Sequence, residues 1–466
     1  MERRRLLEFG AAALLAPGLA WASRRRTVND YSGLTDVEVA SEMRPQSTQE
    51  VGRAVADWPG SISIGGGRFS MGGQVGFPDS LHIDMRTMNR ILFLDVARRV
   101  VRVQAGATWR DLLDVLDPHD LSVKIMQSFS NFTVGGSVSV NCHGRYVRKG
   151  PLINSVRAVQ LVTADGRSME LRPDDELFRG VFGAYGGLGV VTEVELDLEP
   201  NARLARRVDE VVVADYPARF EALAHDPQVL LHNADLRPPR FETARLISWR
   251  TTDEDVTTPE RLIPRDRDYG HHQAAIWAVS ELPGGPQLRE RVEQRMLARK
   301  VVVWRNYEAS LDTDSLEPST RRFSTYLLQE YFVPVPNFAR FVAAMSRILR
   351  GHKVNAINVS IRHSPRDDRT LMTWAPQDVF SFVLYYKQRQ GERARRRAGV
   401  WTRALIDAAL ANGGRYYLPY RLHASASQFR QAYPEVDAFR RLKARFDPQG
   451  KFRNLLWEKY LGASQG

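Results

Sequence analysis

Cysteine is almost absent from this sequence, because Cys142 is the only one in 466 residues. A single thiol excludes an internal disulfide. Neither this cysteine nor the ten histidines show the spacing of metal ligands, so we predict no metal site. The composition also argues against a disordered chain, since 43% of the residues are hydrophobic and 26% are charged, as in soluble globular proteins.

The length exceeds that of one ordinary core and predicts two domains, or one domain with a large insertion. The formal net charge of +12 raises the question of an anionic partner. The basic residues are mostly arginines spread along the chain among Asp and Glu, without a nucleic-acid-binding module, so we expect no nucleic-acid partner. The cluster ERARRR (392–397) is interpreted as a solvated helix face. The alternative is a contact to an anionic substrate or lipid head group, with peripheral membrane association.

The N-terminus has the pattern of an export signal. It reads MERRRLLEFGAAALLAPGLAWAS, with a basic start, an apolar run and a small-x-small cleavage site at 20–22. The run is too short for a membrane-spanning helix unless it is retained as an anchor. Arg3 and Arg4 resemble a twin-arginine signal, and an ordinary secretory signal with extra arginines is the alternative. We predict a signal peptide over residues 1–22 and an exported, periplasmic protein.

Short strands with a few helices, rich in glycine, fill the first part of the chain up to residue 200. Ser47 starts a capped helix that ends near Trp58. Alternating apolar residues predict strands over 91–95, 100–106, 134–141, 156–166 and 190–200. Later strands are longer, over 326–335 and 380–386, and indicate a second domain with an antiparallel sheet. The whole pattern predicts an α+β fold.

A glycine-rich loop, GGGRFS at 65–70, follows the apolar strand SISI. Consecutive glycines let several backbone N–H groups point into one concavity, and such a nest binds phosphate oxygens. Ser70 and Gln74 could add side-chain donors. An ordinary glycine loop is the alternative, since the spacing fits neither a Walker A loop nor a Rossmann fingerprint.

Two further glycine-dense segments, SFSNFTVGGSVSVNCHGR (128–145) and YGGLGVVTEVEL (185–196), favour a nucleotide cofactor. The three segments in this order resemble the FAD domain of the vanillyl-alcohol-oxidase family, also called the p-cresol-methylhydroxylase (PCMH) type. The resemblance implies that they wrap the pyrophosphate, run beneath the flavin and contact it through the main chain. The cofactor-binding residues that it implies are Gly65, Gly66, Gly67, Arg68, Phe69, Ser70, Gln74, Ser128, Thr133, Val134, Gly135, Gly136, Val140, Asn141, His143, Val191 and Tyr417.

The C-terminal half carries LQEYFVP, INVSIR, GGRYYLPYR and KFRNLLWEKYL, in this order. These motifs resemble the sugar-oxidising branch of the family, with the aldonolactone oxidases and the decaprenylphosphoryl-ribose 2'-oxidase. The resemblance implies a two-subdomain FAD-binding domain over 40–200, an antiparallel-sheet substrate cap over 201–398, and a segment over 399–466 that returns to close over the flavin. It places Gln329, Tyr331, Asn358 and Arg362 on cap strands that face the flavin.

Two positions depart from the family pattern. Members with covalent flavin carry His where this loop has Phe69, and a phenyl ring offers no nucleophile, so we predict non-covalent FAD. Cys142 could serve as another tether, but we interpret it as a small packed residue. At Tyr420 the branch carries a Lys close to the flavin or the substrate. A neutral phenol, or Arg421 after a one-residue slip, must replace that cation.

These residues together predict an FAD-dependent oxidoreductase that oxidises a CH–OH group of a sugar-like, polyol or aldonolactone substrate. A base takes the hydroxyl proton and a hydride passes to flavin N5. His143, Tyr420 and Tyr331 are candidates for the base or for substrate orientation, and each could instead be a packed residue. Oxygen or a quinone-type carrier would accept the electrons. Alternatives are a sterol-reductase-like C=C reductase, which export disfavours, and a non-catalytic envelope protein that binds a glycolipid.

Overall fold

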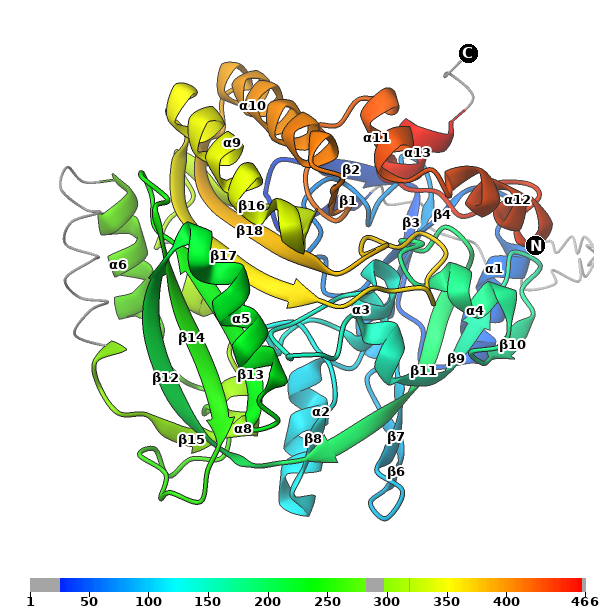
Figure 1. Cartoon of the computed structure of the whole chain (residues 1–466). Coiled ribbons are helices and arrows are strands. Elements are labelled where there is room, and N and C mark those ends of the chain that lie inside the picture. Colours follow the sequence, from blue (N-terminus) through cyan, green and yellow to red (C-terminus); the bar gives the residue numbers. More distant parts are fainter. Residues whose placement is uncertain (1–25, 282–296, 318, 463–466) are drawn as a thin grey trace, which may run out of the picture.

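The computed structural model describes residues 26–281, 297–317 and 319–462. The chain forms one lobe with small sheets and a second lobe with one large antiparallel sheet (Figure 1). The predicted signal peptide of residues 1–22 lies outside the described residues. Among the residues that are described, no helix is both long and apolar enough to span a bilayer.

The first lobe begins with an antiparallel hairpin and a small parallel sheet. The hairpin consists of β1 (Arg26–Asn29) and β2 (Asp36–Val39). The parallel sheet has the order β3 (Ser41–Met43), β5 (Leu81–Asp84) and β4 (Ile62–Gly65). The connection from β3 to β4 contains α1 (Thr48–Asp57), and the Ser47 side chain accepts a hydrogen bond from the Glu50 N–H at its start, as the sequence predicts.

An antiparallel sheet of six strands completes this lobe. Its order is β10 (Ser168–Leu171), β9 (Val156–Val162), β11 (Val190–Pro200), β7 (Val100–Gln104) and β6 (Ile91–Asp95), with β8 (Leu121–Val123) paired to β11. Its helices are α2 (Trp109–Leu116), α3 (Val134–Val140) and α4 (Glu176–Val181). The strands predicted over 91–95, 100–106, 156–166 and 190–200 are confirmed, with β9 and β10 joined at the Asp165-Gly166 turn.

The strand predicted over 134–141 is wrong, because this stretch forms the helix α3. Thr133 caps the helix by accepting a hydrogen bond from the Gly136 N–H, and Asn141 ends it with a left-handed backbone, φ 49°. The alternation of Val and Ser suggested a strand, but seven residues are too few to distinguish the two-residue repeat of a strand from the 3.6-residue repeat of a helix. The Thr133 cap favours the helix.

The second lobe is one antiparallel sheet of eight strands. Its order is β15 (Val302–Trp304), β12 (Arg203–Val212), β14 (Thr243–Thr251), β13 (Val229–Leu236), β17 (Asn355–Ser364), β18 (Val379–Arg389), β16 (Ser324–Pro334) and β19 (Arg415–Tyr416). The helices α5 (Tyr216–His225), α9 (Phe338–Gly351) and α10 (Glu392–Ala411) cover one face, while α6 (Gly270–Glu281) and α8 (Arg305–Ala309) lie near its ends (Figure 1). The strands predicted over 326–335 and 380–386 are confirmed as β16 and β18.

The C-terminal segment touches both lobes. Its strand β19 pairs with β16 of the large sheet, whereas the Ile62 N–H of β4 donates to the Lys451 carbonyl, 2.7 Å away. The helices α11 (Ala426–Ala432), α12 (Val436–Phe446) and α13 (Leu455–Leu461) follow. Helices and antiparallel sheets occur together throughout, which confirms the α+β class.

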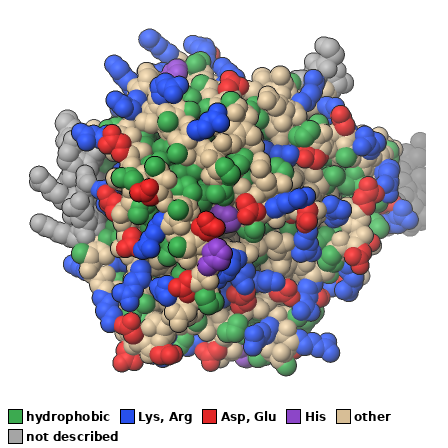
Figure 2. All heavy atoms as spheres, in the orientation of Figure 1, with side chains coloured by type: hydrophobic (Ala, Val, Ile, Leu, Met, Phe, Trp, Pro, Cys, Tyr) green, Lys and Arg blue, Asp and Glu red, His purple; other side chains and the backbone are tan. Residues whose placement is uncertain are grey.

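Basic side chains do not gather into one patch on the face that Figure 2 shows, where Lys and Arg lie among Asp and Glu. The arginines of the cluster 392–397 are exposed on the first turns of α10. This position fits the interpretation as a solvated helix face.

Candidate active site

One cavity is bordered by all three glycine-dense segments. Gly66, Gly136 and Gly189 line it, although each comes from a different segment of the sequence. The prediction that these segments converge on a shared cleft is therefore confirmed. The eight-stranded sheet and the C-terminal segment supply the other side of the cavity.

The first glycine loop packs directly against the start of α3. The Thr133 hydroxyl accepts hydrogen bonds from the N–H groups of Gly67 and Gly136, at 3.3 Å each. A methyl group added to Gly66 would lie 2.3 Å from the Thr133 Oγ1 atom. Glycine is thus required for this close approach of two loops, and the wall that they form consists mainly of backbone. We call it the glycine wall.

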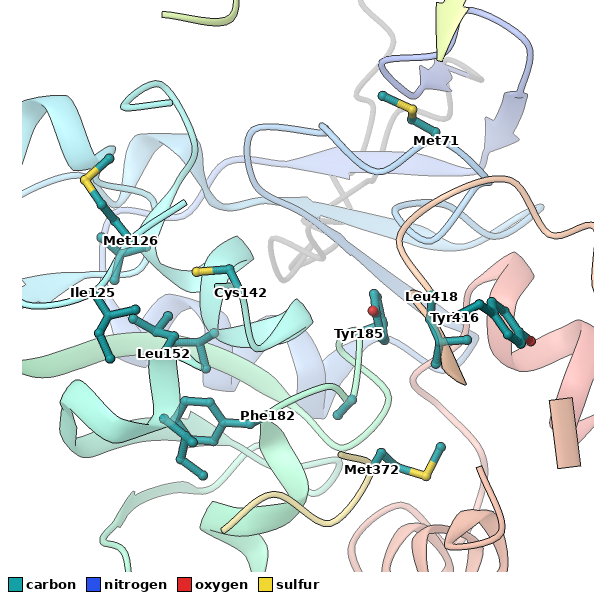
Figure 3. Packing of buried hydrophobic residues seen from close by; sticks show 14 of the residues in the cluster. Met71, Ile125, Met126, Cys142, Leu152, Phe182, Tyr185, Met372, Tyr416 and Leu418 are labelled. Atoms are coloured by element: carbon teal, nitrogen blue, oxygen red, sulfur yellow. The ribbon is translucent and has the colours of Figure 1, made fainter. Parts of the chain in front are cut away.

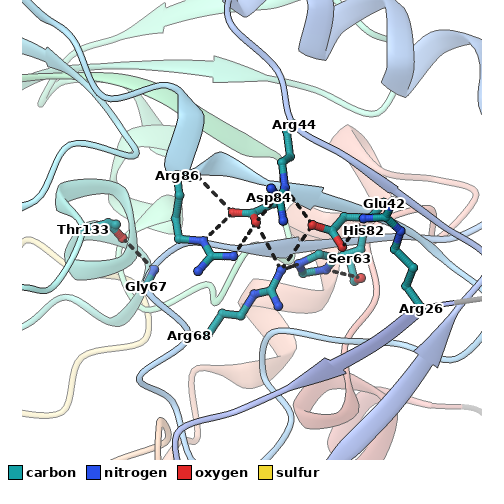
Figure 4. Close-up of polar contacts among 10 residues, drawn as sticks. All are labelled: Arg26, Glu42, Arg44, Ser63, Gly67, Arg68, His82, Asp84, Arg86 and Thr133. Carbon is teal, nitrogen blue, oxygen red and sulfur yellow. Dashed lines mark hydrogen bonds and ion pairs between the residues drawn. The ribbon is translucent and has the colours of Figure 1, made fainter.

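A network of charged residues around the buried Asp84 side chain supports this loop (Figure 4). Arg68 has a left-handed backbone, φ 60°, and its guanidinium lies 3.3 Å from an Asp84 oxygen, which also accepts a 2.6 Å bond from Arg86. Burial opposes ionisation, but the bonds from Arg86 and the charge of Arg68 lower the pKa of Asp84. The network fixes the loop conformation that exposes the glycine backbone.

His82 belongs to the same network and must be neutral there. Its Nε2 atom lies 3.1 Å from Arg68, which can only donate, so Nε2 accepts and the proton sits on Nδ1 beside Ser63. Burial and the charge of Arg68 lower the pKa of His82 to about 4.

FAD fits the groups that line this cavity. The glycine backbone suits a diphosphate, and the rings of Phe69 and Phe132 suit a flat aromatic system. The hydroxyl of Ser128 is buried at the cavity without a hydrogen-bond partner among the described residues, so it is available to a polar atom of a ligand. The residues predicted to bind the cofactor that do line the cavity are Gly66, Gly67, Arg68, Phe69, Ser70, Gln74, Ser128, Thr133, Gly135, Gly136, Val140, His143, Val191 and Tyr417.

Three residues predicted to bind the cofactor do not line this cavity, which corrects their expected placement. Gly65 is the last residue of β4 and abuts His82, and the Val134 side chain is buried in the core. The Asn141 side chain turns away to Thr370, 2.8 Å distant. Gln74 does line the cavity, but its amide is bound to the Leu418 carbonyl, so it joins the loop to the C-terminal segment.

The opposite side of the cavity carries a buried carboxylate, Glu330 of β16. One oxygen lies 2.6 Å from the Nε2 atom of His143, and the other accepts a 3.1 Å hydrogen bond from the Tyr420 hydroxyl. All three residues line the cavity. The His143 ring is held among aromatic rings, with the Trp374 centroid 4.9 Å away. We call this face of the cavity, with Arg362 of β17, the polar wall.

Glu330 is ionised at neutral pH despite its burial. Desolvation alone would raise the pKa, but the charge and hydrogen bond of His143, together with Arg362, lower the pKa of Glu330 below its usual value. The pKa of Tyr420 is raised well above its usual value by burial and by the charge of Glu330, so the phenol keeps its proton. The polar wall thus holds one proton acceptor beside one hydroxyl donor.

Arg362 is the cation of this wall. Its guanidinium borders the cavity, and its Nε atom is buried without a hydrogen-bond partner among the described residues. Burial lowers the pKa of Arg362, and the charge of Glu330 opposes that shift. Such an unsatisfied donor suits a substrate oxygen.

Gln329 and Tyr331 were expected to face the flavin, and this placement is wrong. Side chains alternate along a strand, so Tyr326, Leu328 and Glu330 line the cavity while the neighbours point to the other face. There Tyr331 packs against Phe341 of α9. Asn358 also does not line the cavity, because its amide donates to Asp235 of β13 at 3.1 Å.

Cys142 lies next to His143 and is buried among apolar side chains, with Met126 and Leu152 nearby (Figure 3). Burial raises the pKa of its thiol to about 12, so the reactive thiolate is disfavoured. This environment fits a packed residue. No group of three or more His, Cys, Asp or Glu that could hold a metal occurs in the described part of the chain.

Two of the cavity-lining residues that sequence reasoning missed matter most for the chemistry of the site, Glu330 and Tyr31. Glu330 was available as a signal, because it is the only charged residue in the otherwise apolar or neutral strand YLLQEYFVPV. Tyr31, from the loop between β1 and β2, had no motif that pointed to it.

Comparison with known families agrees with this site. Residues 40–172 match the FAD binding domain family, and residues 273–461 match the D-arabinono-1,4-lactone oxidase family. The first match contains the glycine loop and α3, and the second contains Glu330, Arg362 and Tyr420.

Several characterised proteins are similar along nearly the whole chain. The decaprenylphosphoryl-beta-D-ribose oxidase of Mycolicibacterium smegmatis is 31% identical over 93% of this chain and 95% of its own length. The alditol oxidase of a Streptomyces species is 27% identical over 92% and 97%. The L-gulonolactone oxidase of Mus musculus is 23% identical over 85% and 88%. The chain therefore belongs to the vanillyl-alcohol-oxidase type of FAD-linked oxidoreductases, in the aldonolactone oxidase and decaprenylphosphoryl-ribose oxidase branch, and is an FAD-dependent enzyme acting on CH–OH groups.

Proposed function

We propose that this enzyme oxidises a CH–OH group of a polyhydroxylated small molecule, namely an alditol, an aldonolactone or a related sugar. The observation that carries the proposal is the polar wall. Glu330, Tyr420 and Arg362 offer a carboxylate, a neutral hydroxyl oxygen and a cation within one cavity, which suits neighbouring hydroxyl groups. The alditol and lactone oxidases among the similar proteins support the same substrate class.

Bound FAD would supply the two-electron oxidation. The chain's own part is to place the alcohol and to accept its proton. Glu330 accepts the hydroxyl proton, because each carboxylate oxygen keeps a free lone pair beside its bond to His143 or Tyr420. Arg362 donates to a substrate oxygen, and the Tyr420 hydroxyl, whose proton is bonded to Glu330, accepts from a second substrate hydroxyl through its oxygen. His143 is hydrogen-bonded to the Glu330 carboxylate, so it orients this group and stabilises its negative charge.

The FAD is proposed to be held without a covalent bond. Phe69 offers no nucleophile, and the Cys142 thiol is buried. Acid precipitation tests this point, since dissociable flavin colours the supernatant yellow whereas covalent flavin colours the pellet.

We further propose the division of labour that the family resemblance implies. Residues 40–200 would form a two-subdomain FAD-binding domain, residues 201–398 a substrate cap, and residues 399–466 a segment that closes over the flavin. Export through the signal of residues 1–22 would place the enzyme in the periplasm, with oxygen or a quinone-type carrier as electron acceptor. Peripheral association with a membrane through 392–397 is the accompanying proposal.

Anaerobic mixing of the purified enzyme with polyols, lactones and sugars tests the substrate class. Bleaching of the flavin absorbance by at least one of these compounds is the expected result. A flavin-loaded protein that no alcohol or lactone bleaches would contradict the proposal and favour a binding protein.

A further inference from the structure

The loop between β1 and β2, residues 30–35, is bonded to three chain segments that each contribute other residues to the cavity; we call it the N-terminal loop. The buried carboxylate of Asp30 accepts a 2.9 Å hydrogen bond from the Gly73 N–H, next to the glycine wall. The Ser32 carbonyl accepts a 2.6 Å bond from Thr325 of β16. Arg421 of the C-terminal segment donates to the Thr35 hydroxyl.

Tyr31 lies in the middle of this loop and presents its ring to the cavity. The ring centroid is 5.3 Å from that of Phe69, which in turn is 4.3 Å from that of Phe132. All three rings line the cavity and remain partly exposed to it. They form a continuous apolar surface, which we call the aromatic row.

One hydrogen bond and one cation–π contact from Arg321 hold Tyr31 in position. The Arg321 guanidinium donates to the Tyr31 carbonyl at 2.9 Å and stacks over the ring at 4.8 Å. Burial raises the pKa of Tyr31, and the charge of Glu317 adds to the shift, so the phenol stays neutral. A fixed, neutral ring at this point is suited to contact a flat apolar ligand rather than a phosphate.

The only flat, tricyclic ligand that the established activity requires is the flavin. We propose that the N-terminal loop is a retention strap for the FAD, in which Tyr31 extends the aromatic row against the flavin ring and Asp30 anchors the loop to Gly73, shortly after the first glycine loop. The strap rests on FAD binding and not on the identity of the substrate. It would hold a flavin that position 69 cannot hold covalently.

The test is the rate at which flavin leaves the intact holoenzyme. After dilution into excess buffer, the recovery of free-flavin fluorescence reports release without any turnover. Tyr31→Ala should release flavin about tenfold faster, because it removes a ring contact together with its buried area. Tyr31→Phe is the matched control and should release flavin within about twofold of the wild-type rate, since it keeps the ring.

Asp30→Asn tests the anchor separately. It keeps the shape of the side chain but weakens the charged acceptor of the Gly73 N–H, so release should be several-fold faster although the aromatic row is intact. Wild-type release rates in both Tyr31→Ala and Asp30→Asn would overturn the strap.

Another substitution of Tyr31 tests the ring contact if Tyr31→Ala does not fold. Tyr31→Leu keeps apolar bulk without a flat ring, and release faster than in Tyr31→Phe is expected. Equal rates in these two variants would contradict a ring contact, and flavin that stays in an acid pellet would contradict retention by a strap. If the flavin-containing protein oxidised no polyol, the proposed substrate class would be contradicted, whereas the proposal of a strap would be unaffected.

Discussion

One wall of the cavity is made of backbone, and the wall across from it is made of side chains. The glycine wall depends on Gly66 and Gly136, whose lack of a side chain lets two loops meet at the Thr133 hydroxyl. The polar wall depends on Glu330 and Arg362, which project from the long strands β16 and β17. Backbone groups suit a cofactor that stays the same in every turnover. Side chains, in contrast, can change by substitution and so adapt the site to a particular alcohol. The predictions below separate the two walls.

Glu330→Gln should have the largest effect. The amide keeps the shape but cannot accept the proton, so anaerobic flavin reduction should slow about 10²–10⁴-fold. The flavin content should stay at the wild-type level, because Glu330 belongs to the other wall. Stopped-flow absorbance measures the rate, and wild-type reduction in this variant would remove Glu330 from the mechanism.

Gly66→Ala should damage the glycine wall alone. The added methyl group would lie 2.3 Å from Thr133 Oγ1, so the loops must separate and FAD affinity should fall by about tenfold or more. Gly351→Ala is the control, because no atom lies within 4 Å of its added methyl group. Flavin titration measures the affinity, and tight binding by Gly66→Ala would contradict the requirement for glycine.

Acid should destabilise both lobes through buried neutral histidines. The pKa values of His82 in the first lobe and His363 in the large sheet are each lowered to about 4, with burial as the main cause. The unfolded chain binds protons below about pH 6.5 while the folded chain does not. The free energy of unfolding should therefore lose about 1.4 kcal/mol per pH unit from each of these two histidines between pH 6.5 and 4, and their contribution should stay constant below pH 4.

Thermal unfolding of the holoenzyme across this pH range is the measurement. The melting temperature of His82→Gln should depend less steeply on pH than that of the wild type, even if the variant and the wild type differ in melting temperature at pH 7. An unchanged slope would show that His82 is protonated in the folded protein.

Tyr331→Phe should have the smallest effect. Its hydroxyl is buried without a hydrogen-bond partner among the described residues, and its ring faces α9 rather than the cavity. Flavin content and reduction rate should both stay within about twofold of the wild type, since a buried unpaired hydroxyl contributes nothing to the site. A large decrease in the rate of flavin reduction would contradict this placement and indicate that Tyr331 acts in the cavity.

The glycine wall could be predicted from sequence because its requirement is local. The consecutive glycines around Gly66 and Gly136 indicate a close approach of the backbone from the sequence alone. The capping pattern that begins at Ser47 likewise predicts the start of its helix from four residues. The polar wall could not be predicted to the same degree. Which face of β16 meets the cavity depends on pairing with β18 and β19, and a one-residue shift exchanges Glu330 for Gln329 or Tyr331.

Tyr31 shows a second limit. It reaches the cavity only because Asp30 and Ser32 bond to segments far along the chain, and such contacts leave no periodic pattern in the sequence. The helix α3 was missed for the opposite reason, since a short stretch of alternating Val and Ser fits a strand until the Thr133 cap is considered.

Flavin content and anaerobic reduction rate, recorded on the same samples of wild type, Gly66→Ala and Glu330→Gln, test the separation of the two walls most directly. We predict that Gly66→Ala loses flavin while its remaining flavin is reduced at the wild-type rate. Glu330→Gln should keep its flavin and lose reduction. Parallel loss of both properties in both variants would contradict the account.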